Sequence, residues 1–150
     1  MDLHAILLAT DFSDCAYAAF QTAKKLGRPF GAKIIFLHVI SEKRVAVLAE
    51  YLKVPPENLI PELRERAQEQ LQAFIKKCDP ETLPIESLVT VGAPFQQIAV
   101  LARELAVDLV VMGGHGRGGQ APLEEVFFGS TAEKVVRLLP CPVLCVPLKD

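Results

Sequence analysis

The segment Lys33–Ile40, KIIFLHVI, limits the fold more than any other part of the sequence. It is almost entirely apolar and rich in β-branched residues, a pattern typical of a strand that is buried on both faces. Such strands occur in parallel sheets, which need crossover connections and a helical layer on each side. The segment therefore predicts an α/β fold, provided that helices separate it from other strands.

Helical patterns do separate further strand patterns along the chain. Ser13 is a suitable N-cap for a first helix, and Gly27 followed by Pro29 should end it. Residues 84–91 are less uniformly apolar than residues 33–40, which suits an edge strand. The strands are predicted at 4–9, 33–40, 84–91, 108–112 and 142–146, and the helices at 14–26, 42–53, 61–77, 95–105 and 130–139. We expect one parallel sheet with right-handed crossovers and helices on both faces.

Size and charge limit the classes of function. The chain has 150 residues, 51% of them hydrophobic, which fits a single domain over residues 1–150. Its formal charge of −2 lacks the basic excess that nucleic-acid binding needs. No apolar run approaches the roughly 18 residues of a membrane span, and the first residues do not resemble a signal peptide. We expect a cytoplasmic protein that binds neither nucleic acid nor membrane.

The stretch Met112–Thr131, MGGHGRGGQAPLEEVFFGST, holds six of the nine glycines. Residues 114–119 match the dinucleotide pattern G-x-G-x-x-G, but they follow the fourth strand and lack an acidic residue about 20 positions later. No Walker A loop occurs either. A second pattern pairs earlier glycines with Gly129, Ser130 and Thr131 at the start of a predicted helix, where backbone N–H groups can hold phosphate oxygens. This chemistry indicates binding, and we assign no catalytic or metal-ligating residue.

A second loop completes the expected crevice. Residues 9–13, ATDFS, follow the first strand, and the glycine-rich stretch follows the fourth. If these two strands are neighbours, both loops leave the same edge of the sheet, at the point where ligands commonly bind in folds of this kind. A nucleotide would then lie between them.

The chain resembles the universal stress proteins of the UspA type over essentially its whole length. The matching motifs are ILLATDFS (6–13), LHV (37–39), VGAP (91–94), DLVVMGGHGR (108–117), GSTAE (129–133) and CPVLCV (141–146). The resemblance implies a Rossmann-like fold of the adenine nucleotide alpha hydrolase type, with strand order 3-2-1-4-5. It also implies a homodimer joined through the last strand, from Pro142 to Val146.

The resemblance further implies a bound ATP, with Mg²⁺ or Mn²⁺ carried by its phosphates. By similarity, the adenine and ribose lie against Ala9, Thr10, Asp11 and Val39. Met112, Gly113 and Gly116 border the ribose and phosphates, and Gly129, Ser130 and Thr131 hold phosphate oxygens.

One spacing differs from the family pattern G-x2-G-x9-G-[ST]. If Gly113 and Gly116 are the first pair, twelve residues precede Gly129 instead of nine. If Gly116 and Gly119 are taken as the first pair, nine residues precede Gly129, but the glycines then lie farther from the end of the strand. We favour an insertion of about three residues near Gln120–Pro122, because a surface loop lengthens at small entropic cost.

Two other functions remain open for the same fold. The lengthened loop could leave a homodimeric stress or scaffold protein that binds no nucleotide, and a weak ATP-hydrolysing or adenylate-handling enzyme is the third hypothesis. Individual residues also have structural interpretations. Asp11 could form an Asx-type turn or cap, Gly113 and Gly116 could serve turns alone, His38 could be a satisfied core histidine, and His115 could be solvent-exposed.

The four cysteines give no sign of a disulfide framework. Cys141 and Cys145 lie four residues apart in a predicted strand, which separates them by roughly 13 Å and excludes a bond between them. We interpret all four as small buried apolar side chains.

Overall fold

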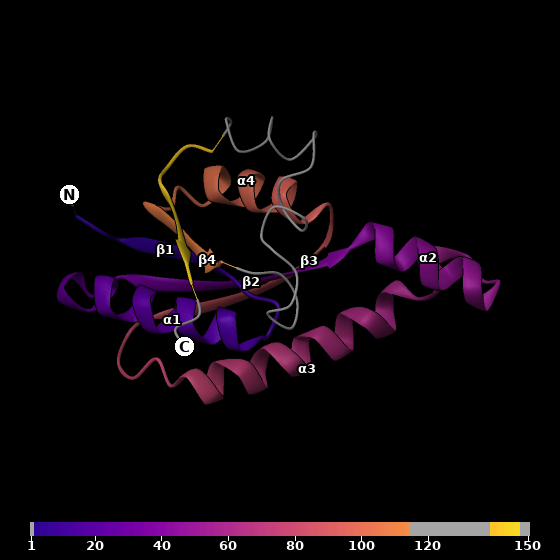
Figure 1. The fold of residues 1–150 in the computed structure, drawn as a ribbon, viewed down its shortest axis with the longest axis horizontal. Helices are drawn as coiled ribbons and strands as arrows, with labels where there is room; N and C mark the ends of the chain where they lie inside the picture. Colours follow the sequence, from indigo (N-terminus) through magenta and orange to yellow (C-terminus); the bar gives the residue numbers. More distant parts are fainter. Residues whose placement is uncertain (1, 115–138, 148–150) are drawn as a thin grey trace.

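The computed structural model describes residues 2–114 and 139–147, and they form a parallel α/β sheet (Figure 1). Its five strands are β1 (Ala5–Ala9), β2 (Lys33–Ser41), β3 (Ile85–Gly92), β4 (Leu109–Gly113) and β5 (Val143–Val146). They lie in the order β3-β2-β1-β4-β5, and every neighbouring pair is parallel. The predicted strand order 3-2-1-4-5 is confirmed, and so is the prediction that residues 84–91 form an edge strand.

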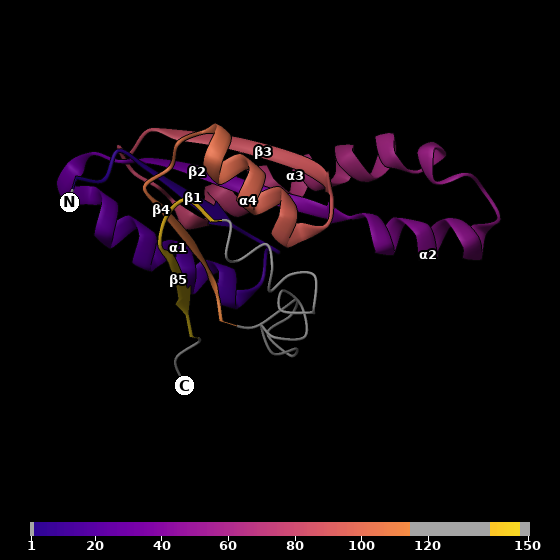
Figure 2. The same ribbon diagram turned by 90° about the horizontal axis from the view of Figure 1, so that it is seen from above.

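Helices cover both faces of this sheet. The helices of the described residues are α1 (Asp14–Gly27), α2 (Glu42–Leu52), α3 (Ile60–Cys78) and α4 (Pro94–Glu104), with short 3-10 turns at Arg28–Phe30 and Pro56–Asn58. Helices α1 and α3 lie on one face and α4 lies on the other (Figures 1 and 2). The helix predicted at 130–139 falls almost wholly outside the described residues.

The first helix begins and ends as the sequence predicts. The Ser13 side chain accepts a hydrogen bond from the Ala16 N–H, which makes it the N-cap. Helix α1 stops at Gly27, but the chain reverses only after a 3-10 turn, at Gly31, where φ is 62°. This left-handed backbone suits glycine.

Two apolar clusters fill the space between the sheet and its helices. Alternate residues of β2 point to opposite faces, so Phe36 packs in the cluster under α1 and α3 while Leu37 packs in the cluster under α4. On the first face, Phe36 stacks on Phe20 of α1 with ring centroids 5.5 Å apart. The prediction that β2 is buried on both faces is confirmed.

Helix α2 and the start of α3 extend beyond the sheet as an arm (Figures 1 and 2). The N-cap of α2 is Ser41, the last residue of β2, so the helix continues directly from the strand. Among the described residues, no helix is long and apolar enough to cross a membrane.

Candidate functional site

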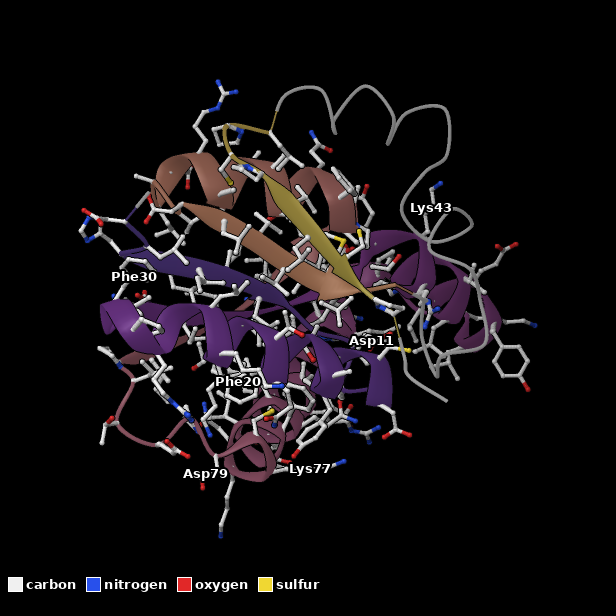
Figure 3. All side chains as sticks on the ribbon, turned by 60° about the vertical axis from the view of Figure 1, so that its left-hand side comes forward. Asp11, Phe20, Phe30, Lys43, Lys77 and Asp79 are labelled. Atoms are coloured by element: carbon white, nitrogen blue, oxygen red, sulfur yellow. The ribbon has the colours of Figure 1, made fainter. Side chains whose placement is uncertain are left out.

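Strands β1 and β4 are neighbours, as the predicted crevice requires. Their register pairs Ile6 with Leu109 and Leu8 with Val111. Because the strands are parallel, the turn after β1 and the glycines that end β4 leave the same edge of the sheet. In Figure 3, Asp11 lies at this edge, near the tips of β4 and β5.

The turn after β1 is held by its own hydrogen bonds. The Thr10 N–H donates to the Leu37 carbonyl over 2.9 Å and extends the ladder between β1 and β2. The Thr10 hydroxyl accepts from the Phe12 N–H over 2.9 Å, and Asp11 Oδ1 accepts from the Ser13 N–H over 3.1 Å. Asp11 thus forms the Asx-type turn that was the structural alternative for it, and its second oxygen has no hydrogen bond to a described residue.

An aromatic contact fixes the same turn from the side. Phe12 has a φ of 68°, a left-handed conformation that costs a non-glycine residue roughly 1–2 kcal/mol. Its ring stacks on His38 of β2 at 4.4 Å between centroids and meets Phe74 of α3 edge-on at 6.0 Å. These contacts oppose the strain. Phe12 could not be predicted from the sequence, because nothing in TDFS marks a left-handed phenylalanine.

His38 links the turn to the second strand. Its Nδ1 lies 2.8 Å from the Thr10 carbonyl oxygen, and since a carbonyl can only accept, Nδ1 carries the proton. The side chain is half-buried. The interpretation of His38 as a satisfied histidine is therefore confirmed, although it lies at the margin of the core and supports the candidate site.

Strand β2 runs past the end of β1. The register between them stops at Ala9 and Leu37, whereas β2 continues to Ser41, and β3 is the one described strand that it pairs with there. The Leu37 carbonyl points toward β1, where it accepts from the Thr10 N–H. Alternate residues of a strand direct their backbone groups to the same side. The backbone groups of Val39 therefore also point to the side of β1, at a level where β1 has ended. The side chains of Ala9 and Val39 pack against the cluster under α4, which leaves their backbone groups as the part that faces the predicted site.

The end of β4 is closely packed. The Met112 side chain is 1% exposed and belongs to the core, which leaves only its backbone at the sheet edge. A Cβ on Gly113 would lie 2.9 Å from Cys15 Cβ and 3.0 Å from the Cys15 carbonyl carbon. The N–H of Gly114 donates to the Val146 carbonyl over 2.7 Å. Gly113 thus lets β4 approach the first turn of α1.

The phosphate-binding half of the predicted site falls on residues 115–138, outside the described residues. This segment contains Gly116, Gly129, Ser130 and Thr131, and also His115 and the insertion near Gln120–Pro122. The described half comprises the β1–α1 turn, the extension of β2 and the end of β4.

The described residues contain no group of three or more histidine, cysteine, aspartate or glutamate side chains able to hold a metal ion. All four cysteines are free. Cys15 and Cys78 are buried as predicted, and desolvation raises the pKa of the Cys78 thiol to about 12 despite the nearby Lys77 and Lys24. The prediction of burial is wrong for Cys145, which is exposed, and only partly right for Cys141, which is half-buried. The physical reason is that β5 lies at the edge of the sheet.

Comparisons with known proteins cover nearly the whole chain. The model of the universal stress protein family matches residues 3–147. Universal stress protein MJ0577 of Methanocaldococcus jannaschii is 29% identical over 157 residues, covering 97% of this chain and 95% of the relative. Universal stress protein YxiE of Bacillus subtilis is 31% identical over 146 residues, covering 94% and 97%.

Solved structures share the fold. That of MJ0577 matches with a TM-score of 0.78 at 29% identity, covering 100% of this chain and 99% of its own. A universal stress protein of Archaeoglobus fulgidus in complex with dAMP matches with a TM-score of 0.62 at 23% identity, covering 97% and 99%. One of Arabidopsis thaliana with AMP bound matches with a TM-score of 0.60 at 19% identity, covering 98% and 93%.

Proposed function

The chain belongs to the universal stress protein family, and we propose that it binds an adenine nucleotide, ATP in particular, where β1 and β4 end. The observation that carries the proposal is the β1–α1 turn. Asp11 is fixed there through Oδ1, beside a strand whose backbone continues past its neighbour. The dAMP and AMP complexes of proteins with the same fold support an adenine nucleotide as the ligand.

In this proposal each part of the site has a separate task. Asp11 accepts hydrogen bonds from ribose hydroxyls or the adenine amine through its second oxygen, and the backbone of Val39 meets the adenine edge. Thr10 and Ala9 form the floor, and the Met112–Gly113 backbone borders the ribose. By family resemblance, Gly116, Gly129, Ser130 and Thr131 hold the phosphates, which carry Mg²⁺ or Mn²⁺. We propose binding without rapid turnover.

We also propose that the protein forms a homodimer through Pro142 to Val146. Among residues 2–114 and 139–147, β5 lies at the edge of the sheet and pairs with β4 alone. Its unpaired backbone groups can form hydrogen bonds with the same strand of a second copy across a twofold axis.

The nucleotide proposal can be tested with one matched substitution. Asp11→Asn retains the oxygen that accepts from Ser13, but it replaces the second carboxylate oxygen with an NH₂ donor. The fold should therefore persist while ATP binding weakens about tenfold or more, since hydrogen bonds to charged groups contribute roughly 1.5–3 kcal/mol. Isothermal titration of ATP and AMP, with and without Mg²⁺, measures both affinities.

A thermal-shift assay gives an independent readout. ATP at about 100 times its dissociation constant should stabilise the wild type by about 2.7 kcal/mol. If the glycine-rich segment holds phosphates, ATP should bind more tightly than AMP. No shift at millimolar ATP would refute the proposal and favour the scaffold alternative.

A further inference from the structure

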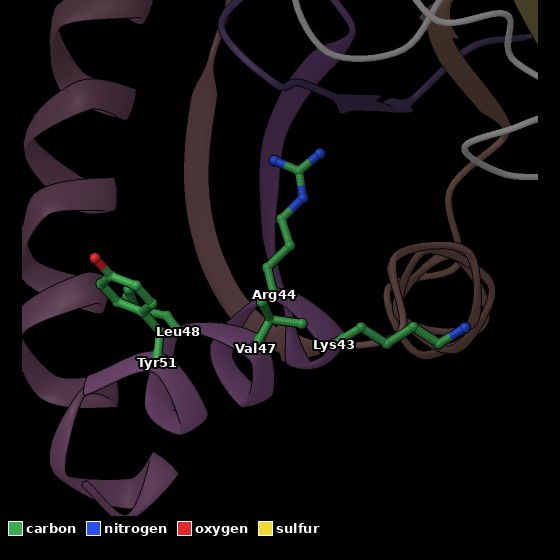
Figure 4. Close-up of a pocket in the computed structure, with 5 residues that line it drawn as sticks. All are labelled: Lys43, Arg44, Val47, Leu48 and Tyr51. Carbon is green, nitrogen blue, oxygen red and sulfur yellow. The ribbon is translucent and has the colours of Figure 1, made fainter. Parts of the chain in front are cut away.

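Helix α2 carries large apolar side chains on its outer face. Val47 is 68% exposed and Tyr51 is 82% exposed, whereas Val45 and Ala49 on the opposite side are buried and attach the helix to the protein. The exposed face forms an open groove of about 410 Å³, lined by Lys43, Arg44, Val47, Leu48 and Tyr51. Figure 4 shows the two basic residues toward one end, Tyr51 and Leu48 at the other, and Val47 between them.

The charges along this face oppose the helix dipole. Lys43 and Arg44 lie in the first turn, where the positive end of the dipole disfavours cations, and Glu50 lies in the last turn, where anions are disfavoured. The stability of α2 therefore does not explain their positions. A local rule broken on an exposed apolar face indicates a function for that face.

The same residues are complementary to a second copy of the face. Lys43 and Glu50 lie seven residues apart, as do Arg44 and Tyr51, so the members of each pair share one edge of the helix. Val47 is the residue nearest the centre of the two pairs taken together. An antiparallel copy related by a twofold axis beside Val47 places Lys43 opposite the partner's Glu50 and Arg44 opposite the partner's Tyr51, each twice. The first contact is an ion pair, and the second is a cation–π contact.

We infer that the α2 face is an interface for a second copy of this chain, in antiparallel orientation. A parallel copy would oppose Lys43 to Lys43 and Arg44 to Arg44, which is repulsive. The arm lies beyond the sheet and away from β5 in both views, so this contact is separate from the strand-edge dimer (Figures 1 and 2). Two helices of 11 residues cover less than the roughly 800 Å² per partner of a standard interface. The association is therefore weak and concentration-dependent.

Charge reversal tests the pairing. Lys43→Glu places two acids opposite each other twice, and Glu50→Lys does the same with two bases. Sedimentation velocity over a concentration series should show each single variant associating at least about tenfold more weakly than wild type. The double variant should recover the wild-type affinity, and so should an equimolar mixture of the two single variants. Unchanged single variants, or a double variant as weak as either, would overturn the inference.

Crosslinking locates the contact independently of β5 and of nucleotide binding. In a Cys145→Ser background, which removes the exposed native thiol, Val47→Cys should form a dimer with a short bis-maleimide. Glu69→Cys, exposed on α3, serves as the control and should give no crosslinked dimer. Adding Lys43→Glu should reduce the Val47→Cys product, and equal crosslinking at Val47→Cys and Glu69→Cys would contradict the inference. Asp11→Asn should leave crosslinking unchanged, so the two proposals can fail separately.

Discussion

The turn at residues 10–13 and the face of α2 at residues 43–51 differ in how their side chains are used. In the turn, a strained Phe12 is held by His38 and Phe74, and Asp11 accepts a hydrogen bond from the Ser13 N–H. On α2, Val47 and Tyr51 project from the protein surface. The turn is small and polar and is held in place by surrounding contacts, whereas the α2 face is apolar and exposed.

This difference indicates two kinds of ligand. A fixed carboxylate beside exposed strand backbone can discriminate a small polar molecule, because little rearrangement is needed on binding. An exposed apolar stripe with charged flanks has no such precision, but it can contact another protein surface. The comparison predicts that substitutions of the residues that support the turn alter stability and nucleotide binding together, whereas Asp11→Asn alters binding alone. Substitutions on α2 should alter association alone.

The largest effect is expected at Gly113, which supports the turn from the side of β4. Gly113→Ala places a Cβ 3.0 Å from backbone carbon of Cys15, so β4 and α1 must separate. We expect unfolding to become easier by about 3 kcal/mol, the upper part of the range for overpacking, and nucleotide affinity to fall. Urea denaturation and calorimetric titration measure the two effects.

Gly31→Ala provides the control for this prediction. Gly31 has a φ of 62° with open space around it, so only backbone strain is added, about 1 kcal/mol. Nucleotide affinity should be unchanged. If both alanine variants reduced affinity equally, Gly113 would have no particular role at the site.

The strands and the helix cap could be predicted from the sequence, but the close contact at Gly113 could not. Apolar runs such as residues 33–40 identified the strands, because burial on both faces leaves a local pattern, and Ser13 was identified as a cap by its local chemistry. The strand order required the family resemblance. The contact of Gly113 with Cys15 joins residues about a hundred positions apart, and no local pattern encodes it.

The same limit applies to the candidate site. Asp11 was predicted as a site residue from its motif. Its interpretations as a turn residue and as a ligand-binding residue are compatible, because one carboxylate oxygen makes the turn and the other is left for a ligand. The left-handed Phe12 depends on packing against β2 and α3, and the exposure of α2 depends on where the arm projects. Both are tertiary properties that a single sequence does not display.

The second prediction separates strain from packing at Phe12. Phe12→Ala removes the contacts with His38 and Phe74 and should cost about 2 kcal/mol, less than a fully buried phenylalanine. Phe12→Gly loses the same ring but relieves the left-handed backbone, so it should be about 1 kcal/mol more stable than the alanine variant. Chemical denaturation of both variants gives their order of stability. If the alanine variant were more stable than the glycine variant, the backbone strain at Phe12 would be absent.

A third and smaller effect is expected at Asp108, at the opposite end of the sheet. A substitution there should affect neither the turn at residues 10–13 nor the face of α2. Asp108 Oδ2 accepts from the His4 N–H over 2.7 Å and from the Ala5 N–H over 3.1 Å, and these bonds lower the pKa of the carboxyl group. The ionised form therefore stabilises the fold above pH about 4, and this contribution is lost as the pH falls through the lowered pKa.

Asp108→Asn should accordingly cost about 1 kcal/mol at neutral pH, a value reduced for solvent exposure. Denaturation curves from pH 7 to pH 3 should show the difference between the two proteins shrinking toward the acid end. A difference that stays constant with pH would mean that the charge of Asp108 does not stabilise the fold.

The smallest stability effect is expected on α2. Val47 is largely exposed, and alanine is the better helix former, so Val47→Ala should leave the free energy of unfolding within about 0.5 kcal/mol of wild type or slightly raise it. The substitution also removes the apolar side chain nearest the proposed twofold axis, so self-association should weaken while nucleotide affinity stays unchanged. Denaturation, sedimentation and titration of this one variant test all three statements. A loss above 1 kcal/mol in dilute protein would show that Val47 packs within its own chain, and the contrast between a supported turn and an open α2 face would then be wrong.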